Sequence, residues 1–147
     1  MKTEEAIFAA GCFWGVEYTF AKVNGVISAE SGYTGGATKE PSYEQVCTGK
    51  TGHAEAVRVV FDSDKVSYLE LLRVFWKCHN PTTLNRQGPD VGTQYRSAIF
   101  YTSDKQKKEA LKSRDELQAK LGKKIVTEIA KSGEFYRAEE YHQKYAE

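Results

Sequence analysis

The hydrophobic pattern changes abruptly at Gly11, and this change constrains the fold more than any other feature of the sequence. Residues 6–10 (AIFAA) form a short apolar run that is typical of a buried strand, and the glycine ends it. Apolar side chains then recur at helical spacing from Phe13 to Phe20, until the Asn-Gly pair at 24–25. A strand that leads directly into a helix predicts a sheet with helices packed against it.

The rest of the chain repeats this alternation of strand and helix patterns. We expect further strands at 26–33, 55–61, 97–101 and 124–129, and helices at 68–76 and 103–121. Ser67 is the expected N-cap of the first of these two helices. Residues 34–42 and 79–95 have the composition of long loops, and the aromatic, charged tail favours a short helical turn. The order of elements predicts an α+β fold, a two-layer sandwich of a sheet and helices.

Length and charge narrow the class of protein. A chain of 147 residues fits one domain, 1–147, and a net charge of +1, from 21 basic and 20 acidic residues, gives no support for a nucleic-acid or membrane partner. No apolar stretch is long enough to cross a membrane, and the first apolar run is too short for a signal peptide. We therefore expect a cytoplasmic monomer.

The three cysteines are Cys12, Cys47 and Cys78. An odd number without paired spacing does not indicate a disulfide framework, and it suits a reducing compartment or a thiol that performs chemistry. A zinc site needs three or four ligands at suitable spacing, which the cysteines and histidines do not show, so we expect no metal.

Cys12 stands at the start of the first expected helix, where backbone N–H groups and the helix dipole favour a thiolate. The alternative is a small buried thiol that serves only packing. Phe13 and Trp14 follow, and because successive helical residues point about 100° apart, one core face cannot cover both. At least one should line an apolar pocket beside the thiol, suited to a methyl or thioether group. Gly11 and Gly15 would allow close approach of the backbone.

Glu55 shares a strand face with the apolar residues Val57 and Phe61, which places a carboxyl at a buried strand end. Burial would raise its pKa and make it a proton donor near neutrality; the alternative is a solvated strand end. His53 could instead be the base of a cysteine hydrolase, or a structural residue of its turn.

Tyr43, Asp90 and Tyr95 lie in the expected loops, where each alone has an ordinary explanation in packing or turn capping. Five segments in the same order nevertheless resemble one family, methionine sulfoxide reductase A, and together they cover nearly the whole chain. They are GCFWG at 11–15, GYTGG at 32–36, SYEQVCTGKTGHAEAV at 42–57, NRQGPDVGTQYRSAIFY at 85–101 and FYRAEEYHQKY at 135–145.

The resemblance implies an enzyme of oxidative damage repair that reduces methionine S-sulfoxide, free or in peptides and proteins, to methionine through a sulfenic acid on Cys12. It also implies a mixed central sheet with a ferredoxin-like core. Phe13 and Trp14 would hold the substrate methyl group, and Glu55 would protonate the sulfoxide oxygen. Tyr43 and Tyr95 would hold that oxygen, with the Asp90 carboxylate near the site.

The resemblance implies no bound cofactor, but an external thiol reductant: thioredoxin, glutaredoxin with glutathione, or dithiothreitol. Many members of the family carry a resolving cysteine near the C-terminus, and no cysteine follows Cys78 here. An external thiol that restores Cys12 directly is the preferred interpretation. Recruitment of Cys47 or Cys78, or a sequence that lacks a tail segment, are the alternatives. A non-catalytic binder, in which the aromatic residues hold a methylated ligand, is the alternative function.

Overall fold

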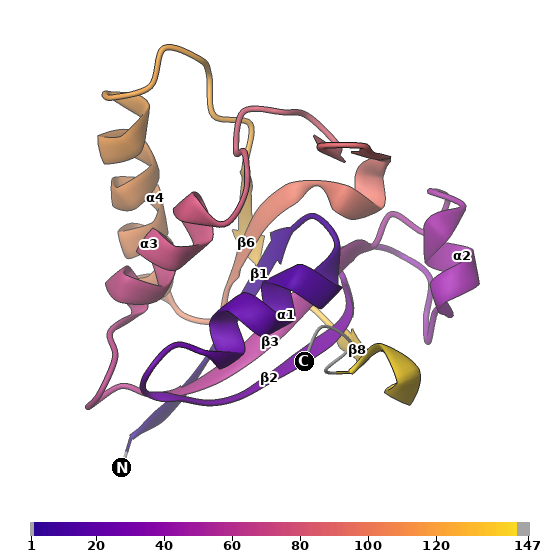
Figure 1. Ribbon diagram of the computed structural model, residues 1–147, viewed down its shortest axis with the longest axis horizontal. Coiled ribbons are helices and arrows are strands. Elements are labelled where there is room, and N and C mark those ends of the chain that lie inside the picture. The colour runs from indigo at the N-terminus through magenta and orange to yellow at the C-terminus, as the bar shows by residue number, and fades with distance from the viewer. Residues whose placement is uncertain (1, 144–147) are drawn as a thin grey trace.

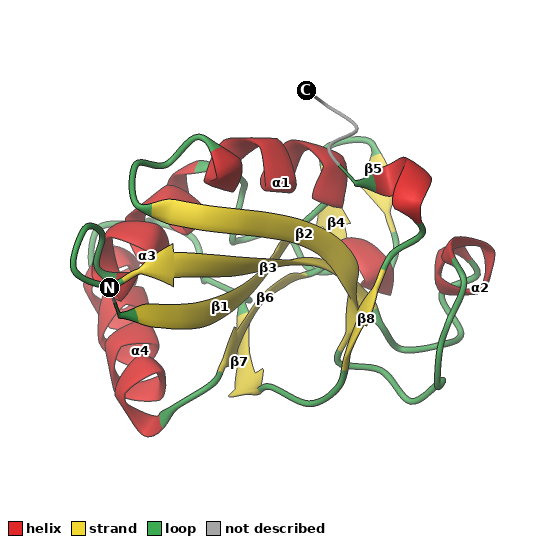
Figure 2. Ribbon diagram, turned by 90° about the horizontal axis from the view of Figure 1, so that it is seen from below, coloured by secondary structure: helices red, strands yellow, loops and turns green. Residues whose placement is uncertain are grey.

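The computed structural model describes residues 2–143 and has a curled six-stranded sheet at its centre (Figures 1 and 2). The strands are β1 (Thr3–Ala10), β2 (Val26–Thr34), β3 (Ala54–Asp62), β6 (Ser97–Tyr101), β7 (Glu128–Lys131) and β8 (Phe135–Arg137). Their order is β7-β6-β1-β3-β2-β8, and every neighbouring pair is antiparallel except β6 and β7. The sheet is therefore mixed, as expected.

The helices pack mainly against one face of this sheet. They are α1 (Phe13–Ala21), α2 (Tyr43–Cys47), α3 (Tyr68–Lys77) and α4 (Asp104–Gln118). Helices α1, α3 and α4 lie over the sheet, whereas the short α2 stands apart at one end of the molecule (Figure 1). The succession β1-α1-β2-β3-α3-β6, with the spatial order β6-β1-β3-β2, is the split βαβ arrangement of a ferredoxin-like core. The predicted fold class is confirmed.

Strand β1 is buried on both faces. Ala6 and Phe8 point toward the helices, and Phe8 stacks on Phe20 of α1 and Phe75 of α3 with ring centroids 4.9 and 5.3 Å apart. Ile7 belongs to a smaller apolar cluster on the opposite face. The central position of β1 explains why residues 6–10 are uniformly apolar, and it fixes where the chain leaves the sheet at Gly11.

Most expected elements are present, including α3 with the Ser67 capping box, but four details were wrong. A short helix, α2, occupies part of the first expected loop, capped by Ser42. The strand expected at 124–129 begins only at Glu128, because the preceding backbone bonds elsewhere: the N–H of Val126 donates to the carbonyl of Pro81. The tail forms strand β8 before its expected turn, a 3₁₀ turn at Glu140–His142.

The second expected loop also holds short elements. Strands β4 (Arg86–Gln87) and β5 (Asp90–Val91) form a small hairpin, which a 3₁₀ turn at Thr93–Tyr95 follows. Within residues 2–143, no helix is both long and apolar enough to cross a membrane.

Candidate active site

The turn between β1 and α1 presents Cys12 as the N-cap residue of the helix. Gly11 makes this turn possible, since its φ is +98° and a Cβ there would meet the Gln87 side chain at 2.9 Å. The backbone N–H groups of Trp14 and Gly15 lower the pKa of the thiol, although the thiol does not accept a capping hydrogen bond. Gly15 is exposed and a Cβ there would meet nothing within 4 Å, so packing does not require glycine at this position.

These donors do not by themselves give a thiolate. Burial raises the pKa of Cys12, the carboxylates of Glu55 and Asp90 raise it further, and the net direction is upward. The helix start thus favours the thiolate, as expected, but burial and the two carboxylates outweigh its effect on the pKa of Cys12. A thiolate also needs the negative charge beside it to be neutralised.

Glu55 lies at the start of β3 and is 1% exposed, so the predicted burial is confirmed. Its Oε1 accepts a hydrogen bond from the N–H of Phe13 at 3.2 Å, whereas its Oε2 is buried without a partner among the described residues. Burial raises the pKa of Glu55 to about 7; the Phe13 bond lowers it in part, and the Asp90 charge adds to the rise. A protonated Glu55 is therefore well populated near neutral pH.

Three aromatic side chains gather beside Cys12. Phe13 is fully buried, while Trp14 is half-buried, which agrees with the expectation that one core face cannot cover both. The two rings lie 6.4 Å apart, and the ring of Tyr43 lies 6.4 Å from each of them. Together they form one apolar wall at the N-terminus of α1.

Tyr95 and Asp90 approach from the segment that follows α3. Burial raises the pKa of Tyr95 to about 12, and the charges of Glu55, Asp90 and Cys12 contribute to the rise, which places these groups within electrostatic reach of one another. Tyr43 and Tyr95 were expected in irregular loops, but Tyr43 is the first residue of α2 and Tyr95 ends a 3₁₀ turn. The structure thus gathers the seven residues singled out from the sequence: Cys12, Phe13, Trp14, Tyr43, Glu55, Asp90 and Tyr95.

Two tail residues that sequence reasoning missed complete the wall. Nδ1 of His142 accepts a hydrogen bond from Nε1 of Trp14 at 2.9 Å, and the His142 ring lies 4.4 Å from that of Tyr43. Glu139 accepts hydrogen bonds from the Tyr33 hydroxyl at 2.9 Å and from the N–H of Tyr43 at 3.0 Å. The only signal in the sequence was the family-like tail segment, which did not indicate what these side chains contact.

His53 does not act as the base of a cysteine hydrolase. Its Nδ1 accepts from the N–H of Gly36 at 3.1 Å, and its Nε2 lies 2.6 Å from the carbonyl of Thr38. With Nδ1 as acceptor and Nε2–H as donor, no lone pair is left to take a proton from Cys12. His53 instead fixes the glycine-rich loop, where a Cβ on Gly36 would meet the backbone N of His53 at 2.3 Å.

The other two cysteines differ in their surroundings. Cys47 is the exposed last residue of α2, and its thiol lies close enough to the Tyr43 hydroxyl for each group to shift the pKa of the other, so Cys47 adjoins the cluster. Cys78 donates to the carbonyl of Phe75, and burial raises its pKa to about 11. Within the described part of the chain, no group of three or more potential ligands could hold a metal ion.

The cluster combines a thiol, a neutral proton donor and phenol hydroxyls beside an apolar wall. A thiol can attack an atom bonded to oxygen when a neighbouring acid protonates that oxygen. Such a site is suited to removing oxygen from a small, partly apolar group.

Comparisons with known proteins agree with this chemistry. The family model described as peptide methionine sulfoxide reductase matches residues 4–147. A peptide methionine sulfoxide reductase MsrA of Methanothermobacter thermautotrophicus is 60% identical over 146 residues, which are 98% of this chain and 86% of the relative. The corresponding protein of Pasteurella multocida is 54% identical over 143 residues, 97% and 82% of the two chains.

Solved structures show the same fold. Mxr1 from Saccharomyces cerevisiae in reduced form has a TM-score of 0.93 and 41% identity, covering 98% of this chain and 84% of its own. Methionine sulfoxide reductase A of Corynebacterium diphtheriae has a TM-score of 0.94 and 39% identity, covering 97% and 73%. Mxr1 in complex with Trx2 has a TM-score of 0.70 and 28% identity, covering 98% and 85%.

Proposed function

The chain belongs to the peptide methionine sulfoxide reductase family, and we propose that it reduces methionine S-sulfoxide, free or in peptides and proteins, to methionine through a sulfenic acid on Cys12. The observation that carries the proposal is Glu55. Its carboxyl is buried at the base of the cluster, has a pKa of about 7 and keeps one oxygen without a partner among the described residues. This arrangement supplies a proton where a sulfoxide oxygen would need one.

The chemistry follows from the weakness of the sulfoxide as an electrophile. Its oxygen carries negative charge, so the sulfur becomes open to attack only when that oxygen is protonated or strongly hydrogen-bonded. Glu55 gives the proton, and the hydroxyls of Tyr43 and Tyr95 donate hydrogen bonds to the oxygen. The Cys12 sulfur attacks the sulfoxide sulfur and forms an S–S bond. The S–O bond of the substrate then breaks as the oxygen passes to the Cys12 sulfur, and the S–S bond breaks as methionine leaves. Cys12, oxidised by two electrons, is left as a sulfenic acid. One thiol and one sulfoxide thus give one sulfenic acid and one thioether.

Cys12 and Glu55 act as a coupled pair in this proposal. The Glu55 carboxylate raises the pKa of Cys12, so neutralising Glu55 removes part of the obstacle to a thiolate. A thiol beside a carboxylate and a thiolate beside a carboxylic acid contain the same number of protons. Moving the proton from Cys12 to Glu55 therefore creates the nucleophile and the acid together, and the N–H groups of Trp14 and Gly15 stabilise the new negative charge.

The aromatic wall gives the proposed site its selectivity. Phe13 and Trp14 hold the methyl group, and the Tyr43 and Tyr95 hydroxyls hold the oxygen. The third substituent of the sulfur can then point in only one direction. A sulfoxide is chiral, and a site that fixes both its methyl group and its oxygen accepts one epimer. A non-catalytic binder of methylated ligands would need no carboxyl with a raised pKa beside a thiol, and the family membership does not support it.

A thioredoxin-type protein is the reductant that the comparisons favour, because a structure of Mxr1 in complex with Trx2 is among the relatives. The proposal also includes that glutaredoxin with glutathione, or dithiothreitol, reduces the Cys12 sulfenic acid directly. Of the two other thiols, exposed Cys47 adjoins the cluster and half-buried Cys78 does not, so Cys47 is the better candidate for an internal resolving thiol. The proposal also includes that the enzyme is monomeric and cytoplasmic. Its single catalytic domain spans residues 1–147, and it needs no metal or bound cofactor.

The test is turnover of separated epimers. Incubation with a methionine S-sulfoxide and dithiothreitol should yield methionine, and the R epimer should remain. Cys12→Ser should abolish the reaction and keep the fold, whereas Cys78→Ser should keep most of the activity. Absence of turnover, or equal turnover of both epimers, would refute the proposal.

A further inference from the structure

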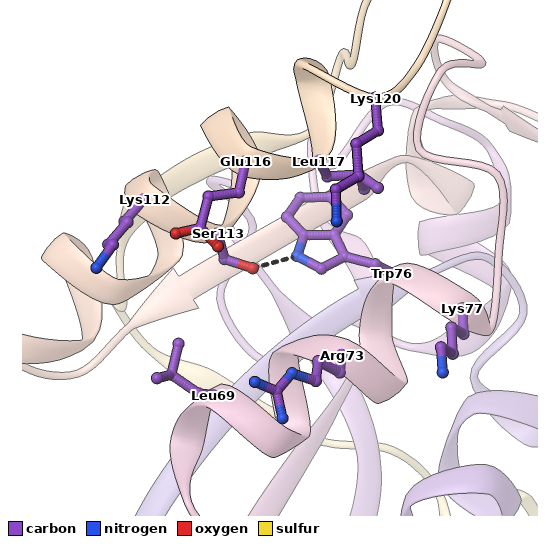
Figure 3. A pocket seen from close by; sticks show the side chains of 9 residues that line it. All are labelled: Leu69, Arg73, Trp76, Lys77, Lys112, Ser113, Glu116, Leu117 and Lys120. Atoms are coloured by element: carbon purple, nitrogen blue, oxygen red, sulfur yellow. Dashed lines mark hydrogen bonds between the residues drawn. The ribbon is translucent and has the colours of Figure 1, made fainter.

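A hollow lies between α3 and the C-terminal part of α4 (Figure 3), and none of its lining residues belongs to the cluster around Cys12. It is an open groove of about 540 Å³, a volume within the range of ligand sites in proteins. Its lining residues are Leu69, Arg73, Trp76, Lys77, Lys112, Ser113, Glu116, Leu117 and Lys120. The proposed reaction uses none of them.

The floor of this α3–α4 groove is apolar and held in place. Nε1 of Trp76 donates a hydrogen bond to Oγ of Ser113 at 2.8 Å, which joins the two helices and fixes the indole ring (Figure 3). Because this bond satisfies the only donor of the indole, the ring offers carbon surface to a ligand. Leu69, which is 41% exposed, and the half-buried Leu117 extend that apolar surface.

The walls of the groove are strongly positive. Four cations line the groove, Arg73 and Lys77 on α3, Lys112 on α4 and Lys120 just after the end of α4, together with one acidic residue, Glu116. None of these charged side chains forms an ion pair within residues 2–143, although the chain as a whole has nearly equal numbers of acids and bases. Cations at helical spacing of four, such as Arg73 and Lys77, repel each other. The groove therefore has an excess of positive charge, since Glu116 is the one acidic side chain among its described lining residues.

We propose that this groove binds an acidic segment of a partner protein. Its carboxylates pair with the cations of both walls, and an apolar side chain between them packs on Trp76. The cations stand on α3, on α4 and just after the end of α4, and their side chains do not converge on one point (Figure 3), so they match charges distributed along a chain better than a single phosphate. The described lining contains the aliphatic residues Leu69 and Leu117 but no aromatic side chain besides Trp76, whereas single-stranded nucleic acids need aromatic platforms for successive bases.

The test follows binding through the indole N–H signals of the nitrogen-15-labelled full chain, which contains two tryptophans. The probe is a short synthetic peptide in which leucine and phenylalanine alternate with glutamates, and its neutral control carries glutamine in place of each glutamate. The acidic peptide should shift the Trp76 signal and leave the Trp14 signal in place. Trp76→Phe assigns the signals, and Trp14→Phe assigns them independently should the first variant not fold.

Charge reversals locate the binding site. Lys112→Glu with Lys120→Glu should weaken binding of the acidic peptide by roughly tenfold or more, since two favourable pairs become repulsive. The matched double reversal outside the groove, Lys65→Glu with Lys131→Glu, changes the net charge equally and should alter affinity by less than about twofold. Binding should also weaken with added salt.

Three results would overturn the proposal. The neutral peptide could bind as tightly as the acidic one, or both double reversals could weaken binding equally, which would show only a general charge effect. A single-stranded RNA could shift the Trp76 signal at lower concentration than the peptide, which would identify a nucleic-acid site instead.

Discussion

Replacing Glu55 by glutamine should change how stability depends on pH, in a direction opposite to that of most carboxyl substitutions. The pKa of Glu55 is about 7 in the folded protein, against a reference value of 4.5. Between these two values the unfolded chain loses this proton while the folded protein keeps it, so the free energy of unfolding falls as pH rises. Over this range the loss amounts to roughly 3 kcal/mol, at about 1.4 kcal/mol for each pH unit.

The Glu55→Gln variant has no such proton to lose. Its amide oxygen can still accept from the N–H of Phe13, so the local geometry is kept, although the amide nitrogen gains no partner from the described residues. Its stability relative to the natural chain should therefore improve by roughly 3 kcal/mol between pH 4.5 and pH 8. Urea denaturation of both proteins across this range measures the difference, provided that the m-values agree.

The activity of the Glu55→Gln variant should fall, although its stability relative to the natural chain improves with rising pH. Loss of a general acid lowers kcat/KM by roughly 10²- to 10⁴-fold, so the variant should be relatively more stable at pH 8 and much slower. Glu44→Gln, which removes an exposed carboxyl on α2, is the matched control and should follow the natural chain in both measurements. A stability difference that does not change with pH, or one that favours the natural chain as pH rises, would show that Glu55 is not held as a buried acid.

Three further predictions concern the thiol, the turn and the tail. One equivalent of methionine S-sulfoxide without added thiol should leave Cys12 as a sulfenic acid that dimedone traps, whereas loss of two hydrogens by intact mass would reveal an internal disulfide. Gly11→Ala should lower the free energy of unfolding by about 1–3 kcal/mol, because alanine is strained at a φ of +98° and its Cβ would meet Gln87. Urea denaturation measures this loss, and an unchanged midpoint of denaturation would contradict the prediction. His142→Phe keeps an aromatic ring at this position but removes the His142 nitrogen that accepts from the Trp14 N–H. It should raise KM for the sulfoxide more than it lowers kcat. An effect confined to kcat would argue that His142 does not help to position the substrate.

The parts of the site that were predictable depend on local pattern. The period-2 face of β3 was enough to place Glu55 among buried residues, because alternation along a strand decides which side chains face the core. The change of period at Gly11 likewise placed Cys12 at a helix start. Neither inference needed to know which other segment lies nearby.

The parts that were wrong or missed depend on distant segments. The pKa of Cys12 rises because folding buries the thiol and brings Glu55 and Asp90 close to it, and no local pattern reports those contacts. Helix α2 is too short to show periodicity. His142 contacts Trp14 across 128 residues of sequence, so nothing near either residue indicated the contact.

That long-range contact has a consequence for biosynthesis. The wall beside Cys12 contains Trp14 from the start of the chain and both Glu139 and His142 from its end. A chain that emerges from the ribosome N-terminus first can form β1, α1 and their core contacts while the tail is still being made. The hydrogen bond that the Trp14 indole donates to His142 can form only after residue 142 has emerged from the ribosome. If the proposed function holds, a nascent chain carries the nucleophile Cys12 for most of its synthesis before the aromatic wall proposed to select the substrate is complete.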